Sequence, residues 1–120
     1  MTEGAAQPAI TRLIAGVPVS DLDAGIDWYT RFFGRAPDMR AGSEMLWDVD
    51  EHATLFIEPG TARVGTGRIT FVVTGLDGLL ERLASVGIGH EPIETYSNGV
   101  RHAKIPDPDG NAIAFAEPPE

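Results

Sequence analysis

A five-residue segment occurs twice in this chain and constrains its fold more than any other feature. Residues 19–23 (VSDLD) recur as residues 73–77 (VTGLD), 54 positions later. In both copies a stretch of alternating apolar residues precedes the segment, and apolar residues at helical spacing follow it. The sequence therefore predicts a duplicated unit, a strand followed by a helix, within one chain of 120 residues.

Apolar stripes predict one helix after each copy of the segment. The first helix is expected over residues 21–33, where Ser20 or Asp21 would cap the first turn and Gly34 would end it. Trp28 and Phe32 lie off the main stripe and could join a dimer contact. The first stripe consists of Leu22, Ile26, Tyr29 and Phe33, and the second of Leu76, Leu79, Leu80, Leu83 and Val86. Gly87 and Gly89 are expected to end the second helix.

Alternating residues predict the strands and their two faces, because successive side chains of a strand point to opposite sides of a sheet. Near the C-terminus, Ile113 and Phe115 share one face, and Ala112, Ala114 and Ala116 line the other. Such small side chains leave room for a ligand. Strands are expected at about residues 12–19, 45–49, 53–58, 68–73, 100–105 and 112–117, the last two joined by a turn over 106–111.

Composition excludes several classes of function. The chain has 9 basic and 18 acidic residues, a net charge of −9, which disfavours nucleic acids and anionic membranes as partners. It has no cysteine, so disulfides, thiolate metal sites and cysteine nucleophiles are excluded. No apolar run approaches the roughly 18 residues that span a bilayer. These features favour a cytoplasmic protein.

Three motifs resemble those of one family. Residues 17–23 (VPVSDLD), 28–34 (WYTRFFG) and 107–111 (DPDGN) resemble, in this order and spacing, the vicinal oxygen chelate superfamily of glyoxalases, bleomycin-resistance proteins and extradiol dioxygenases. The resemblance covers about residues 10–117. It implies an α+β fold of two βαβββ modules whose sheets curl around a cavity, usually completed in a homodimer. We expect a tail at residues 1–9 and one domain at 10–118, with modules at about 10–60 and 66–118.

The resemblance also implies where a metal ion would bind. Metal-dependent members hold a divalent cation with His and Glu side chains from four strands. By position, these ligands fall on Ile14, Phe56, Arg68 and Ala114, none of which can bind a cation. We therefore expect a cavity with no metal and no other cofactor. An alternative metal site would use Glu58, His102 and Glu117, although Glu117 has the wrong strand parity to join Ala114.

A mixed set of side chains remains on the predicted cavity face. Arg68 could bind a carboxylate, phenolate or carbonyl oxygen, and His102 or Glu58 could accept a proton. Structural roles stay open: Glu58 could pair with Arg68, and His102 could be solvated. The register around Trp47 is also open. The predicted catalytic residues are His102, Glu58 and Arg68, and the predicted ligand-binding residues are Ile14, Trp47, Phe56, Thr70, Tyr96 and Ala114, with Asp48 and Lys104 nearby.

Two classes of function follow. The first is a metal-independent binding protein like the bleomycin-resistance branch, which would sequester an antibiotic or metabolite; the net charge of −9 would draw cationic drugs. The second is a metal-independent epimerase, cyclase or lyase, with His102 or Glu58 as base and Arg68 stabilising an enolate. A metal-dependent lyase or dioxygenase is third.

Two geometric observations would separate the first two classes. If His102 and Arg68 approach a common point within hydrogen-bond reach, catalysis is favoured. If Trp47, Phe56 and Tyr96 form a stacking slot, sequestration is favoured.

Other titratable residues are expected to have ordinary roles. Asp107 and Asp109 lie in a turn sequence in which aspartate accepts hydrogen bonds from local backbone amides. His52 and His90 lie in turn-like stretches and are expected at the surface.

Overall fold

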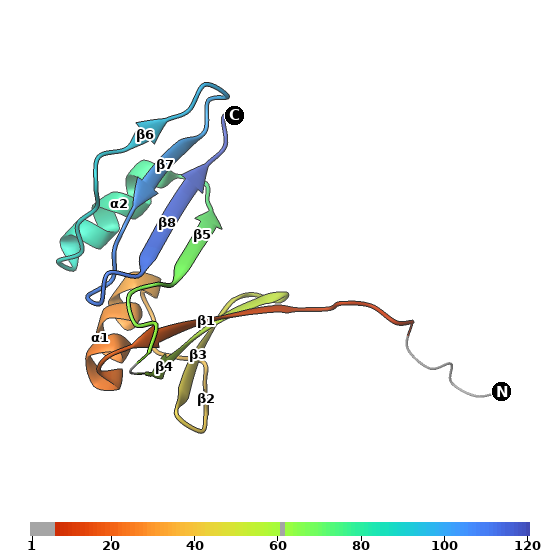
Figure 1. Ribbon diagram of the computed structural model, residues 1–120. Coiled ribbons are helices and arrows are strands. Elements are labelled where there is room, and N and C mark those ends of the chain that lie inside the picture. The colour runs from red at the N-terminus through yellow and green to blue at the C-terminus, as the bar shows by residue number, and fades with distance from the viewer. Residues whose placement is uncertain (1–6, 61) are drawn as a thin grey trace.

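The computed structural model describes residues 7–60 and 62–120 and contains two four-stranded sheets, each with one helix (Figure 1). Sheet A has the strand order β1-β4-β3-β2, and sheet B has the order β5-β8-β7-β6. The elements are β1 (Leu13–Val19), α1 (Leu22–Phe33), β2 (Met39–Ala41), β3 (Glu44–Asp50), β4 (Ala53–Pro59), β5 (Arg68–Val72), α2 (Leu76–Ser85), β6 (Glu94–Thr95), β7 (Arg101–Lys104) and β8 (Ala112–Glu117). The predicted α+β fold of two βαβββ modules is confirmed.

The first helix begins and ends where its capping residues predict. The side chain of Asp21 accepts a hydrogen bond from the Ala24 N–H at 3.1 Å, and Gly34 follows the helix with a φ of 77°. Two short edge strands, β2 and β6, were not predicted, because three and two residues are too few to show alternation. The predicted tail at residues 1–9 lies largely outside the described residues. None of the described helices is long and apolar enough to cross a membrane.

The second helix takes its cap from a distant strand. Its N-cap residue, Gly75, has no side chain, so the Glu117 carboxylate on β8 accepts the Leu76 N–H at 2.8 Å. Arg101 donates to Glu117 at 2.7 Å and to Asp77 at 3.1 Å. The Leu76 N–H and then Arg101 lower the pKa of Glu117. Glu117 therefore lies on the helix side of sheet B, as its strand parity predicts.

The core joins both modules through the aromatic residues of α1. Trp28 and Phe32 are 6% and 2% exposed, and the Phe32 ring stacks on Phe115 of sheet B with centroids 5.4 Å apart. The expectation that Trp28 and Phe32 join a dimer contact is wrong, because α1 packs against both sheets and buries them within the chain. The apolar face of sheet B, which includes Ile113, completes this core.

The turn between β7 and β8 is tied to both modules by buried hydrogen bonds. Asp107, only 4% exposed, accepts hydrogen bonds from the Tyr29 hydroxyl and from the backbone and side-chain amides of Asn111, each at 2.8 Å. Asn111 also donates to the Pro18 carbonyl and accepts the Gly67 N–H. Burial and the Asp107 carboxylate raise the pKa of Tyr29 far above its usual range. The expected structural role of Asp107 is confirmed.

Candidate functional site

The face of sheet B that points away from α2 carries most of the predicted site. Pairing places Arg68 beside Ala112, Thr70 beside Ala114, and Ala114 beside Lys104; His102 lies beside Ala116. In Figure 1, α2 covers the rear of sheet B, so this open face is turned toward the viewer. The alanines form a shallow floor between the longer side chains of β5 and β7, as the alternation in residues 112–116 predicts.

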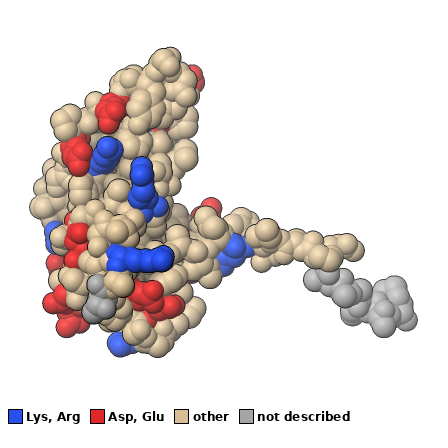
Figure 2. All heavy atoms as spheres, viewed as in Figure 1, with Lys and Arg blue, Asp and Glu red and all other residues tan. Residues whose placement is uncertain are grey.

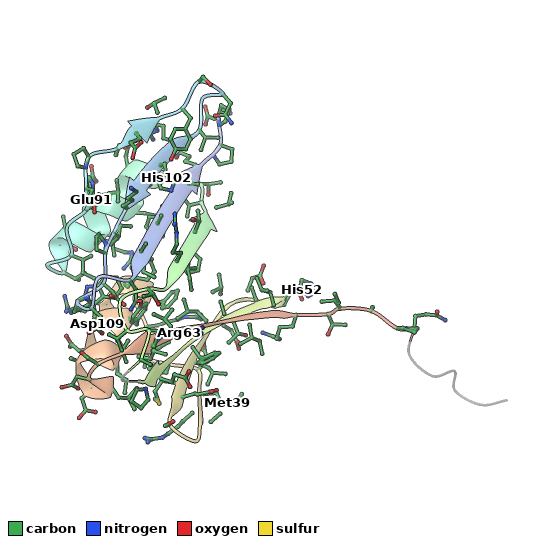
Figure 3. All side chains as sticks on the ribbon, in the orientation of Figure 1. Met39, His52, Arg63, Glu91, His102 and Asp109 are labelled. Atoms are coloured by element: carbon green, nitrogen blue, oxygen red, sulfur yellow. The ribbon has the colours of Figure 1, made fainter. Side chains whose placement is uncertain are left out.

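His102 is half-buried and stacked on a tyrosine. Its ring lies parallel to that of Tyr96, with centroids 5.6 Å apart and an interplanar angle of 27°. Among the described residues, His102 Nδ1 is the one buried side-chain nitrogen or oxygen without a hydrogen-bond partner. His102 is therefore not a fully solvated imidazole, and its Nδ1 lacks the hydrogen-bond partner that buried polar atoms usually have. By contrast, His52 lies at the far end of sheet A and is exposed, as is His90 (Figure 3).

Arg68 and His102 lie at opposite ends of the open face. Their partners on β8, Ala112 and Ala116, are four residues apart, which corresponds to roughly 13 Å along a strand. Arg68 and His102 therefore do not converge on one point. Glu58 lies in sheet A, and no ion pair joins it to Arg68 within residues 7–60 and 62–120. The open face thus has a cationic end and an aromatic end.

Trp47 belongs to the core. It is 0% exposed, its indole N–H donates to the Arg35 carbonyl at 3.0 Å, and its ring stacks on Phe33 with centroids 5.6 Å apart. Trp47 pairs with Leu55, which places it on the opposite face of sheet A from Phe56. Trp47, Phe56 and Tyr96 therefore do not form the stacking slot considered from the sequence.

Sheet A presents a polar cluster that the sequence analysis missed. Thr54, only 5% exposed, donates its hydroxyl hydrogen to Asp48 at 2.8 Å and accepts a hydrogen bond from Arg12. Arg12 and Asp48 also form an ion pair at 3.4 Å. Alternation along residues 53–58 puts Thr54 and Phe56 on one face, but only the pairing of β3 with β4 brings Thr54 beside Asp48. The cluster neutralises Arg12 and Asp48 near the N-terminal end of β1.

Comparison with known proteins identifies the family. The model of the Glyoxalase/Bleomycin resistance protein/Dioxygenase superfamily matches residues 10–115. The chain belongs to this superfamily. A search of curated proteins found no match.

Three solved structures are similar to this chain. A glyoxalase/bleomycin resistance protein from Catenulispora acidiphila is 36% identical, with a TM-score of 0.83 and coverage of 90% of this chain and 98% of that chain. A lactoylglutathione lyase from Agrobacterium tumefaciens is 21% identical, with a TM-score of 0.75 and coverage of 92% and 96%. The protein named oxidase ChaP-H1 is 24% identical, with a TM-score of 0.75 and coverage of 92% and 98%. The last two comparisons show the fold alone.

The metal-binding positions implied by the superfamily carry unsuitable side chains. Ile14 is 53% exposed, Phe56 lies over Gly16, and Ala114 lies on the floor of sheet B. These three side chains have no lone pair to donate, and Arg68 supplies only N–H donors. This set does not fit a divalent cation. The alternative set also fails, because Glu117 and His102 lie on opposite faces of sheet B; among the described residues no three His, Asp or Glu side chains are grouped to hold a metal.

Proposed function

We propose that this member of the glyoxalase superfamily binds a small molecule without a metal ion and sequesters it, as an antibiotic or a metabolite. The observation that carries the proposal is the open face of sheet B. Its alanine floor leaves space for a ligand, while Ile14, Phe56, Arg68 and Ala114 stand where metal ligands would be required. Thr70 and Tyr96 border this space. A cytoplasmic location, favoured by the lack of cysteine, stays a prediction.

We further propose that a second copy of the chain completes the cavity. β1 and β5 are edge strands of their sheets, and they expose apolar side chains: Leu13 is 70% exposed, Ile14 53% and Val72 75%. A hollow of about 430 Å³, lined by Leu13, Val72 and Phe71 among others, lies between the two sheets. Edge strands with exposed apolar residues favour association with another chain, which supports a homodimer.

Val72→Glu is expected to weaken this dimer at least about 10-fold, because a carboxylate would be buried without a partner. Sedimentation velocity over a concentration series measures the change. Met39→Glu is the matched control, since Met39 is 58% exposed on β2, away from the apolar hollow. A wild-type protein that stays monomeric, or equal dissociation by both variants, would contradict the proposed dimer surface.

Ala114→Phe is expected to weaken ligand binding at least about 10-fold, because the added ring fills the floor of the open face. The probe is N-phenylnaphthylamine, a neutral aromatic whose fluorescence rises in an apolar site. Ala84→Phe, at an exposed position on α2, is the control and should bind as the wild type does. Binding should persist with EDTA, and mass spectrometry of candidate ligands should recover them unchanged. Loss of binding with EDTA, or equal weakening by both variants, would overturn the proposal.

A second candidate function is metal-independent acid–base catalysis. The Nδ1 atom of His102 favours it, because this imidazole nitrogen has no hydrogen-bond partner among the described residues and imidazole is the commonest acid–base group in enzymes. The separation of His102 from Arg68 along β8 disfavours a mechanism in which both act on one reacting atom. If the wild type converts a ligand to a product, and His102→Gln still binds that ligand but no longer converts it, the second function is supported.

A further inference from the structure

Two cationic side chains on the open face of sheet B have no acidic partner. The chain has nine basic residues. Four arginines form ion pairs with aspartate or glutamate and two others donate to backbone carbonyls; these are Arg12, Arg31, Arg35 and Arg101, and then Arg40 and Arg82. Arg63, in the loop between β4 and β5, has no side-chain partner among the described residues. Within the described part of the chain, the side chains of Arg68 and Lys104 make neither an ion pair nor a hydrogen bond. What distinguishes Arg68 and Lys104 from the other basic residues without an ion pair is that both lie on one face of sheet B and line one hollow.

Arg68 and Lys104 border the same hollow. It has a volume of about 450 Å³, its floor includes Ala112, and the two cations reach it from β5 and β7 on either side of β8. Neighbouring strands lie about 4.8 Å apart, so two long side chains can reach across an alanine toward one ligand group. Glu91 also borders the hollow, but it forms no ion pair with Lys104. Figure 3 shows Glu91 beside the edge of sheet B.

The charges of this region favour an anion. Two cations facing one hollow repel each other, and a bound anion removes that repulsion while gaining two charge-assisted hydrogen bonds. Figure 2 shows Lys and Arg side chains on this face, over sheet B and at its junction with sheet A, with Asp and Glu side chains beside them. Arg68, Lys104 and Glu91 are the charged residues that line the hollow, and together they give it one net positive charge, in contrast to the net charge of the chain. The cationic drugs expected from that net charge would be repelled here.

The aromatic end of the face indicates the rest of the ligand. Lys104 and His102 are two residues apart on β7 and share a face, which separates their Cα atoms by about 6.8 Å. Between the hollow and His102 lies the alanine floor, and the His102 ring is already stacked on Tyr96. A flat ring over Ala114 would lie beside the His102 and Tyr96 rings while its carboxylate occupied the hollow.

We propose that the site selects planar aromatic carboxylates, with the carboxylate between Arg68 and Lys104 and the ring over the alanine floor beside His102. The inference rests on the proposed binding function and names the charge and shape of its ligand. Arg68 carries a permanent positive charge at a position where the superfamily resemblance implies a metal ligand.

The test compares naphthoate with naphthylmethanol, its neutral analogue, in titration calorimetry at low salt. The wild type should bind naphthoate at least 10-fold more tightly, about 1.4 kcal/mol in binding free energy. Arg68→Gln and Lys104→Gln should each remove most of this preference. Arg40→Gln, which makes the same charge change on β2, should retain it, and Glu91→Gln should increase it.

The outcomes separate the two proposals. Equal affinity for both probes in the wild type, or equal effects of Arg40→Gln and Arg68→Gln, would overturn the anion inference and leave the binding function standing. If neither probe binds, the anion inference is overturned, and binding of N-phenylnaphthylamine decides separately whether the binding function stands. Preference for naphthoate that is lost in Arg68→Gln and Lys104→Gln supports both, and higher salt should then weaken naphthoate binding more than naphthylmethanol binding.

Discussion

Asp107→Ala is expected to lower the free energy of unfolding by about 3–5 kcal/mol, because the removal of one carboxylate leaves several buried donors without an acceptor, each costing about 1–3 kcal/mol. Those donors are the Tyr29 hydroxyl and the two amides of Asn111. Asp107 and Asn111 lie in the turn that joins β7 to β8, and Asn111 also donates to the Pro18 carbonyl on β1. Urea unfolding followed by circular dichroism measures the loss.

Two further variants identify the source of this effect. Tyr29→Phe removes one donor but leaves Asp107 three others, so a smaller loss of about 1–2 kcal/mol is expected. Glu81→Gln, at an exposed position on α2, should change the free energy of unfolding by less than about 0.5 kcal/mol. A loss under about 1 kcal/mol in Asp107→Ala would show that the buried network contributes little to stability.

Trp47→Ala is expected to cost about 3–5 kcal/mol of stability, the range for removal of a large aromatic side chain from a packed core. Trp47 is fully buried against Phe33 and Tyr29, and its indole N–H is bonded to the Arg35 carbonyl. Chemical unfolding of the variant, followed by circular dichroism because the fluorescence of Trp47 is lost, provides the measurement.

Tyr96→Ala is the comparison for Trp47→Ala. Tyr96 is 43% exposed and its ring contacts His102, so its removal should cost less than about 1 kcal/mol of stability while weakening naphthoate binding. If Trp47→Ala instead leaves stability unchanged and weakens ligand binding, Trp47 is a wall of the ligand site and the burial argument is wrong.

The proposals divide the open face of sheet B between two tasks. The end near Arg68 and Lys104 would bind the charged group of a ligand, and the end near His102 would contact its ring. The Ala114→Phe variant tests the floor between these ends, and the charge variants test one end alone. Together they show whether a ligand occupies the whole face or only the hollow.

Much of the fold could be predicted from the sequence because its signals are local and repeated. The segment at residues 19–23 and its copy at 73–77 mark a strand followed by a helix in each module. Asp21 and Gly34 mark the ends of α1, since a cap depends on only a few neighbouring residues. Alternation likewise predicted that Ile113 faces the core and that Ala114 lies on the open face.

The sequence by itself determined the two modules, the family resemblance and the residue types available to the site, because these depend on local patterns. Only the tertiary structure decided which side chains meet. The pairing of β3 with β4 places Trp47 in the core. The Glu117 carboxylate accepts the Leu76 N–H at the start of α2, 41 residues away in the chain. β8 pairs with both β5 and β7, and the register of these pairs places Arg68 far from His102. The same register brings Arg68 and Lys104 to one hollow. Parity gives the face of each residue within one strand, but distances across a sheet depend on strand order and register, which arise from contacts between segments far apart in the chain.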